Sequence, residues 1–424
     1  MELKEGYKLT EAGVVPENWN IERIIDCCEY ADYRGKTPPK TQSGTFLVTA
    51  RNVRMGYIDY VDSQEFVPTS LYDQIMRRGK PRIGDVLITT EAPLGNVAQI
   101  DREDVALAQR IIKYRPKSDS LSSTYLKHYF LSSQFQQILD DNSSGSTAKG
   151  IKGRILHQLP VVLPGTAEQE AIAEALSDAD ALIESLEQLI AKKRQIKQGA
   201  MQELLTGKKR LPGFRSMANY KESVVGRIPN DWDAIEVGAI TVTHRQGYYT
   251  KDRYVDQGVR LVRITDLLNP HVDYATMPML KIATSDHELY RVHAGDFLFA
   301  RSGAIGRYAI VYENVDAVFG SYIIRFTFDS SRISNEFFGY LYETEIVWNQ
   351  LLSITQGSSN ININAANIKS LSIPLPEVDE QTAIATILSD MDAEIAALET
   401  KLAKARQVKQ GMMQELLTGN IRLI

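Results

Sequence analysis

The sequence predicts an α+β protein with two pseudo-symmetric globular α/β domains separated by an antiparallel coiled coil of two long helices. Three observations predict this fold. The chain of 424 residues repeats itself at an offset of 212 (381 minus 169, from Gln169 and Gln381), which is half its length. Each copy ends in a segment with heptad spacing of apolar residues, and each begins with short β-rich runs broken by glycine and proline. At roughly 100–200 residues per domain, the length also favours more than one domain.

The repeat is clearest in the segment that closes each half. Residues 169–211 match residues 381–423, and about 28 of the 43 aligned positions are identical. The rest of each half has diverged further, although Pro16 to Trp19 still matches Pro229 to Trp232. Each half is therefore a divergent domain followed by a nearly invariant tail. We expect the boundaries to fall at 1–165, 166–211, 212–377 and 378–424.

The invariant tails have the spacing of coiled-coil helices. Their apolar residues recur in steps of four and three, which form one continuous seam on a helix. Beyond Ile190 and Leu402 we expect the seam to change register. It would run through Ile196, Ala200 and Leu204 in the first helix and through Val408, Met412 and Leu416 in the second. The predicted seam consists of Ile172, Leu176, Ile183, Leu186, Ile190, Ile384, Leu388, Ile395, Leu398 and Leu402.

The two heptad helices are expected to pair with each other. A single amphipathic helix usually packs against its own domain. Two matching helices in one chain can instead supply each other's partner. Because halves related by a pseudo-twofold axis run in opposite directions, we expect an antiparallel pair with one domain at each end.

The divergent segments, about 165 residues each, are long enough to form cores of their own. Short β-rich runs dominate them, such as residues 86–90 in the first and 321–326 in the second. Helical stretches follow these runs, including residues 123–130 and 335–341. Each domain is therefore expected to mix α and β structure.

Composition excludes several classes of protein. With 48 basic and 53 acidic residues, the net charge of −5 gives no overall field that would draw the chain onto DNA or an anionic membrane. The apolar runs are far shorter than the ~18–20 residues of a membrane span, and the first residues lack a secretion signal, so we expect a cytoplasmic protein without a membrane partner. The two cysteines, Cys27 and Cys28, are adjacent, which suits neither a structural disulfide nor a zinc site.

Motifs for catalysis are also missing from the sequence. The run Gly35-Lys36-Thr37 lacks the upstream glycine of a phosphate-binding loop, and no His-Glu-x-x-His occurs. The adenine methyltransferase motif of Asn or Asp, two prolines and an aromatic residue is absent, and the six histidines form no nucleophile or metal constellation. We expect the chain to catalyse no reaction itself and to bind no cofactor or metal.

Local basic windows are the candidate nucleic-acid contacts. Residues 33–58 contain five basic residues and no acidic one, and such runs with interleaved aromatic and amide groups suit phosphate and base contacts. The best window of the second domain is 243–251, whose His, Arg and Gln side chains can hydrogen-bond to base edges. The second domain is less basic overall, so its signal is weaker. The candidates are Tyr33, Arg34, Lys36, Thr37, Lys40, Arg51, Asn52, Arg54, Arg110, Lys149, His244, Arg245, Gln246, Tyr248, Lys251, Arg263 and Arg301.

The tails resemble a known family. The runs Arg194-Gln-Ile-Lys-Gln-Gly-Ala-Met-Gln-Glu-Leu-Leu-Thr-Gly and Arg406-Gln-Val-Lys-Gln-Gly-Met-Met-Gln-Glu-Leu-Leu-Thr-Gly are similar to conserved regions of the specificity (S) subunits of type I restriction-modification enzymes. The resemblance covers the whole chain. It implies two target-recognition domains that each read one half of a split site in double-stranded DNA, with the coiled coil setting the distance between the halves.

The resemblance also implies a division of labour among subunits. Two methyltransferase (M) subunits would dock on the helices, and two restriction (R) subunits would join them. Adenosylmethionine would be held by M, and ATP-driven cleavage would belong to R. The present chain would then bind no cofactor, which explains the missing motifs.

Two alternatives stay open from the sequence. A scaffold that joins two protein-binding domains through the coiled coil would show no sequence-dependent retention of DNA, and the acid-free window 33–58 argues against it. An enzyme of unfamiliar type would show turnover without partner subunits.

Overall fold

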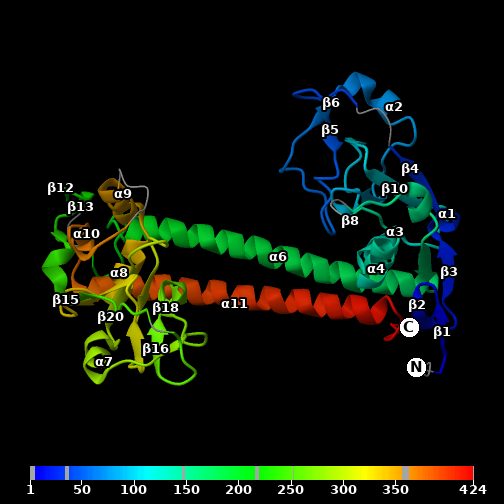
Figure 1. The fold of residues 1–424 in the computed structure, drawn as a ribbon. Coiled ribbons are helices and arrows are strands. Elements are labelled where there is room, and N and C mark those ends of the chain that lie inside the picture. The colour runs from blue at the N-terminus through cyan, green and yellow to red at the C-terminus, as the bar shows by residue number, and fades with distance from the viewer. Residues whose placement is uncertain are drawn as a thin grey trace. The chain divides into compact units, whose positions relative to one another are not determined.

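The computed structural model describes residues 5–33, 38–145, 149–214, 219–251, 253–355 and 362–423. The chain divides into two compact units, of which unit 1 is Met1–Glu187 with Thr400–Ile424 and unit 2 is Gln188–Glu399. Two helices of 39 residues, α6 (Thr166–Leu204) and α11 (Val378–Leu416), contribute one part to each unit (Figure 1). The compact units therefore cut through both helices and differ from the four consecutive segments that we expected.

Unit 1 contains the first globular domain, which we call domain 1. Its elements before α6 are β1 (Tyr7–Thr10), β2 (Gly13–Pro16), β3 (Asn20–Arg23), α1 (Ile24–Cys27), β4 (Cys28–Asp32), β5 (Thr45–Val48), β6 (Phe66–Val67), η1 (Thr69–Leu71), α2 (Tyr72–Ile75), β7 (Val86–Thr90), β8 (Leu94–Gln99), β9 (Val105–Leu107), β10 (Ile111–Pro116), α3 (Ser123–Leu131), α4 (Ser133–Asp141), α5 (Gly153–Leu156) and β11 (Pro160–Leu163).

Two sheets form the body of domain 1. The first is antiparallel with the order β4-β10-β7-β8, and the second has the order β6-β5-β9 with β5 and β9 parallel. Every residue of the central strand β7 is buried. Because side chains alternate along a strand, Ile88 faces the core shared with α3 and α4, while Leu87 faces the core shared with the second sheet.

Unit 2 contains the second globular domain, which we call domain 2. Its elements are β12 (Tyr220–Ser223), β13 (Gly226–Pro229), β14 (Asp233–Glu236), η2 (Val237–Ile240), β15 (Thr241–Gln246), β16 (Val259–Val262), η3 (Ile264–Asp266), β17 (Leu267–Leu268), β18 (His271–Val272), β19 (Met279–Leu280), α7 (Thr284–Tyr290), β20 (Asp296–Ala300), β21 (Tyr308–Ile310), β22 (Ala317–Phe319), β23 (Ile323–Phe328), α8 (Asn335–Tyr342), α9 (Glu345–Thr355), α10 (Ala365–Lys369) and β24 (Ser372–Leu375).

Domain 2 has the same internal frame as domain 1. Its sheets have the orders β15-β23-β20-β21 and β19-β16-β22, and β16 and β22 are parallel. The strand registers also agree. In domain 1 Pro160 pairs with Arg23, and in domain 2 Ser372, 212 residues after Pro160, pairs with Glu236, which lies four residues after Trp232 as Arg23 lies four after Trp19. The predicted pair of pseudo-symmetric α/β domains is confirmed.

Each domain is fastened to its helix ends by a buried tryptophan. In unit 1 the indole N–H of Trp19 donates to Glu168 at 3.0 Å, and Nη2 of Arg422 lies 2.7 Å from the same carboxylate. In unit 2 Trp232 and Arg210 contact Glu380 in the same way, at 3.0 Å and 2.7 Å. The motif that sequence comparison found between residues 16–19 and 229–232 therefore marks where each domain meets its helices.

The helix segments run antiparallel within each unit. In unit 2, Lys197 pairs with Asp392 at 2.6 Å and Arg210 with Glu380, so partner numbers fall as the α6 number rises. In unit 1 the α6 carboxylates of Asp180, Glu187 and Glu168 pair in turn with Lys409, Arg406 and Arg422 of the chain's last segment. In these three pairs too, the residue number in the last segment falls as the α6 number rises.

The seam between the helix segments is mostly apolar. Eight of its ten predicted residues are buried, and Ile183 and Leu398 are half-buried. Ile172 and Leu176 also join the core of domain 1, and Ile384 and Leu388 join that of domain 2. The ends of the seam thus pack on the globular domains as well as on the partner helix.

The predicted change of register was wrong at Ile196 and Val408, although Leu204 and Leu416 of the same prediction are buried. Ile196 and Val408 are 47% and 51% exposed. The steps of four and three continue instead through Lys193 and Lys197, whose ammonium groups lie 2.7 Å and 2.6 Å from Glu394 and Asp392. A lysine can occupy a seam position because its aliphatic stem packs while its charged end reaches a carboxylate at the edge.

No helix in the described ranges is long and apolar enough to span a bilayer.

Candidate nucleic-acid interface

A shared turn follows the parallel strand β5 in domain 1 and β16 in domain 2. In domain 1 the Asn52 side chain accepts the N–H of Thr49 at 2.9 Å, and in domain 2 the Asp266 side chain accepts the N–H of Arg263 at 2.8 Å. Both residues are buried. The amide of Asn52 also donates to the carbonyl of Asp59 at 2.9 Å. Asn52 therefore holds the turn together, in contrast to its predicted place on a DNA-contacting surface.

Arg51 projects from this turn in domain 1. It is exposed, and within the part of the chain that the structure describes its side chain forms no ion pair. The next basic residue, Arg54, is held by Asp62 at 3.0 Å and Asp59 at 3.4 Å. Arg51 is therefore the better placed of the two to contact an external phosphate.

Three further basic candidates of domain 1 are half-exposed and paired with carboxylates. Lys40 lies 2.7 Å from Glu65, Arg110 lies 2.8 Å from Glu91, and Lys149 lies 2.5 Å from Asp140. Exposed pairs of this kind contribute little to stability and can exchange partners. These side chains remain reachable for a polyanion.

The predicted window 33–58 is only partly described. Arg34, Lys36 and Thr37 lie outside the described residues. Tyr33 is buried, its hydroxyl donates to the carbonyl of Gly79, and burial raises its pKa. Tyr33 thus packs within domain 1, and its hydroxyl is already bonded there.

In domain 2 the candidate residues begin on the edge strand β15. His244, Arg245 and Gln246 are exposed. The ring of His244 stacks on Phe326 with centroids 5.5 Å apart, and the Arg245 guanidinium lies over the ring of Tyr290 at 5.8 Å. These contacts hold the polar ends of both side chains at the surface.

Beyond this strand a hollow of about 520 Å³ opens in domain 2. It brings together three of the predicted residues, Tyr248, Lys251 and Arg263, from separate stretches of the chain. Three further tyrosines are among the lining residues, each more than half exposed: Tyr249, Tyr254 and Tyr322. We call this cavity with these six residues the tyrosine hollow. Exposed aromatic and cationic groups together are typical of nucleic-acid contact surfaces.

Arg301 lies beside the tyrosine hollow. Its backbone N–H donates to the carbonyl of Tyr322 at 2.8 Å, and its side chain is half-buried. In domain 1 the matching bond runs from Thr90 to Arg110 at 2.9 Å. Arg110 and Tyr322 therefore occupy the same position in the two domains, as do Arg51 and Thr265 on the shared turn. The frame is common, and the exposed side chains differ.

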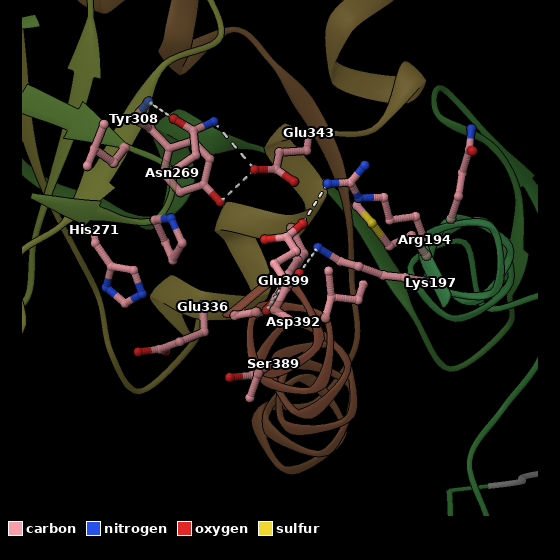
Figure 2. A pocket seen from close by; sticks show the side chains of 18 of the residues that line it. Arg194, Lys197, Asn269, His271, Tyr308, Glu336, Glu343, Ser389, Asp392 and Glu399 are labelled. Atoms are coloured by element: carbon pink, nitrogen blue, oxygen red, sulfur yellow. Dashed lines mark hydrogen bonds and ion pairs between the residues drawn. The ribbon is translucent and has the colours of Figure 1, made fainter. Parts of the chain in front are cut away.

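A larger hollow of about 790 Å³ lies within unit 2, between domain 2 and the helix segments (Figure 2). Glu343 accepts hydrogen bonds from Tyr308 at 3.3 Å and Asn269 at 3.4 Å, and burial raises its pKa. The cations that line the hollow, Arg194 and Lys197, are paired with carboxylates of α11. Four acidic residues against two paired cations make this hollow a poor match for phosphate: Glu336, Glu343, Asp392 and Glu399.

The described residues contain no cluster of three His, Cys, Asp or Glu side chains that could hold a metal ion. Cys27 and Cys28 are buried free thiols with their sulfur atoms 3.9 Å apart. The candidate interface thus contains no metal cluster among the described residues, and the exposed groups described above, which are cations, an amide and tyrosines, make it up.

Comparison with known proteins identifies the family. Residues 16–196 and 229–407 each match the type I restriction modification DNA specificity domain. The chain belongs to this family. Two copies of the specificity domain account for the internal repeat, and the resemblance inferred from the tails is confirmed.

Relatives of this specificity-family chain align over most of its length. It is 24% identical over 430 residues to the type I restriction enzyme MjaVIII specificity subunit of Methanocaldococcus jannaschii, covering 99% of this chain and 97% of the relative. It is 23% identical over 333 residues to the EcoBI specificity subunit of Escherichia coli, covering 75% and 70%. The crystal structure of a type I restriction-modification S subunit from M. genitalium shares the fold, with a TM-score of 0.58, 14% identity and coverage of 96% and 97%.

Proposed function

We propose that this chain is the sequence-specific DNA-binding subunit of a type I restriction-modification complex, and that each domain reads one half of a split site. The observation that carries the proposal is the shared frame with different exposed residues at matching positions. Arg51 and Arg110 in domain 1 correspond to Thr265 and Tyr322 in domain 2. Two readers with one backbone and different side chains suit two different half-sites.

The helix pair sets the distance between the half-sites. Half-sites about one turn of duplex apart, roughly 34–36 Å, present their major grooves on the same face of the DNA. Antiparallel ion pairs in both units support a fixed helix register. A fixed register makes capture of the second half-site effectively intramolecular once the first is bound.

Partner subunits supply the chemistry and part of the affinity. Two M subunits dock on the helices, two R subunits join them, and this chain transfers no methyl group and cleaves no DNA. The complex acts in the cytoplasm on double-stranded DNA. The net charge of −5 is compatible with this role because partners can add phosphate contacts.

Co-expression of the chain with its M subunit, followed by genome-wide mapping of methylated adenines, tests the proposal. The expected result is one split motif with a constant spacer. Exchanging residues 229–377 for those of a relative is expected to change one half of the motif and leave the other intact. A scaffold that joins protein-binding domains predicts no motif, and that outcome would overturn the proposal.

A matched deletion tests the spacing role of the helices. Removing residues 183–189 together with 395–401 takes one heptad from each helix and leaves the seam in phase. The loss of about 10 Å of helix is expected to shorten the permitted spacer by about three base pairs. Removing only one of the two segments breaks the pairing register and serves as the control. An unchanged spacer in the double deletion would count against this role.

A further inference from the structure

Arg263 is the most firmly positioned cation of the tyrosine hollow. Its Nε and Nη2 atoms donate to the two carboxylate oxygens of Asp266 at 3.0 Å and 2.8 Å. Asp266 also accepts the backbone N–H of Arg263 at 2.8 Å and is buried. A bidentate pair of this kind orients the planar guanidinium as well as attracting it.

The matching turn of domain 1 shows what the carboxylate adds. There Thr49 stands in place of Arg263, and Asn52 stands in place of Asp266. Asn52 accepts the same backbone N–H at 2.9 Å, so an amide is sufficient to hold the turn. The carboxylate occurs in the domain where an arginine must be oriented.

The free donors of Arg263 face away from this clamp. Its Nη2 atom has a second, longer contact of 3.3 Å with the carbonyl of Thr276, and its Nη1 atom has no partner within the described ranges. The side chain is 35% exposed at the lining of the hollow. A ligand with two adjacent acceptor atoms can therefore accept hydrogen bonds from Nη1 and replace the carbonyl of Thr276 as the second acceptor for Nη2.

We propose that Arg263, positioned by Asp266, reads a guanine in the major groove of the half-site bound by domain 2. Guanine matches these donors because its O6 and N7 atoms are adjacent acceptors on the major-groove edge. The inference rests on the proposed function and names one residue that determines specificity. Asp266 acts through Arg263 and is a positioning residue.

The neighbours of Arg263 suit the flanking backbone. Lys251 and the hydroxyls of Tyr249, Tyr254 and Tyr322 line the same hollow and are exposed. Cations and hydroxyls of this kind contact phosphate and sugar, which fixes the protein on the duplex without reading sequence. Arg263 is the group in this set whose orientation is held by a buried carboxylate.

The test uses the full chain co-expressed with its M subunit, with adenine methylation mapped for Arg263→Lys and Asp266→Asn. The lysine keeps the charge and loses the planar fork, while the asparagine reproduces the domain 1 turn and loses the bidentate clamp. Both variants are expected to relax one G·C position of one half-site, with the preference for guanine falling about 10- to 100-fold. Arg260→Ala, which removes an exposed arginine of β16, is the matched control and should relax no position.

The outcomes separate this inference from the proposed function. The other half-site is an internal control, and thermal unfolding shows whether each variant folds as the parent does. A folded Arg263→Lys chain with unchanged preference at every position overturns the inference and leaves the split-site function intact. A half-site for domain 2 without a G·C pair would also overturn it. A parent chain without any split motif refutes the proposed function itself.

Discussion

The ammonium nitrogen of Lys197 lies 2.6 Å from the carboxylate of Asp392, within the helix segments of unit 2. The residues 212 positions away form the same pair in unit 1, since Lys409 contacts Asp180. Asp392 also accepts the hydroxyl of Tyr340 at 2.8 Å, so a domain residue joins the pair. Charged residues at otherwise apolar seam positions select one partner and one register, because any slip leaves a charge without its counterpart.

A pair of alanine substitutions tests which face of α6 forms the seam. Ile190 is buried and Ile196 is exposed. Ile190→Ala is expected to lower the free energy of unfolding by about 2–5 kcal/mol because it leaves a cavity. Ile196→Ala is expected to change it by less than about 0.5 kcal/mol. Urea unfolding followed by circular dichroism measures both, and equal losses would contradict the seam described above.

Glycines at two places in the last segment predict opposite effects of alanine. Gly419 has a φ of +72°, and an added Cβ would meet the ring of Pro16 and lie 3.1 Å from Trp19. Gly419→Ala is therefore expected to destabilise the chain by about 1–3 kcal/mol. Gly411 lies inside α11, where a Cβ meets nothing within 4 Å. Gly411→Ala is expected to stabilise by about 0.5–1 kcal/mol. A thermal melting temperature that moves in the same direction for both variants would refute the assignment.

Repeats and periodicity were sufficient to predict the architecture because both are properties of the sequence itself. The continuation of the seam was missed at Lys193 and Lys197, since heptad rules count apolar residues and a lysine stem is apolar only in part. The prediction instead placed the nearest apolar residue, Ile196, in the seam, and this residue faces solvent.

The candidate interface was harder to predict than the fold. Residue type does not report burial, so Asn52 and Tyr33 could not be told apart from exposed neighbours such as Arg51. Tyr254 and Tyr322 were missed because they reach the tyrosine hollow from two loops that are far apart in the sequence. Their proximity depends on sheet pairing, for which the local sequence carries no signal.

The buried His128 predicts a loss of stability in mild acid. Burial lowers its pKa from 6.5 to about 2, with Lys127 and Lys409 adding to the effect. Below about pH 6.5 the His128 side chain is therefore protonated in the unfolded chain but stays neutral in the folded chain. Stability from this group is complete above pH 6.5 and is lost as the pH falls, by about 1.4 kcal/mol between pH 7.5 and 5.5.

His128→Gln removes this titration and keeps a polar side chain near Ser177, which lies 3.3 Å from Nε2 of His128. The urea midpoint of the variant is expected to fall less between pH 7.5 and 5.5 than that of the parent. His271→Gln, which removes an exposed histidine, is the control variant. Identical slopes for the parent and His128→Gln would show that His128 does not titrate as described.

Arg51 is expected to contribute affinity without sequence preference. It is exposed on the shared turn and lacks a carboxylate partner within the described chain. A DNA phosphate can therefore pair with the Arg51 guanidinium without breaking an existing ion pair. In the complex with M, Arg51→Ala should weaken binding to cognate and non-cognate duplexes by a similar factor. It should also reduce the slope of log affinity against log salt by about one. Arg23→Ala removes an exposed arginine bonded to Gln158 outside the basic windows and should leave the slope unaltered. Titrations at several salt concentrations measure both slopes. A base-specific loss for Arg51→Ala would instead place Arg51 among the residues that read the sequence.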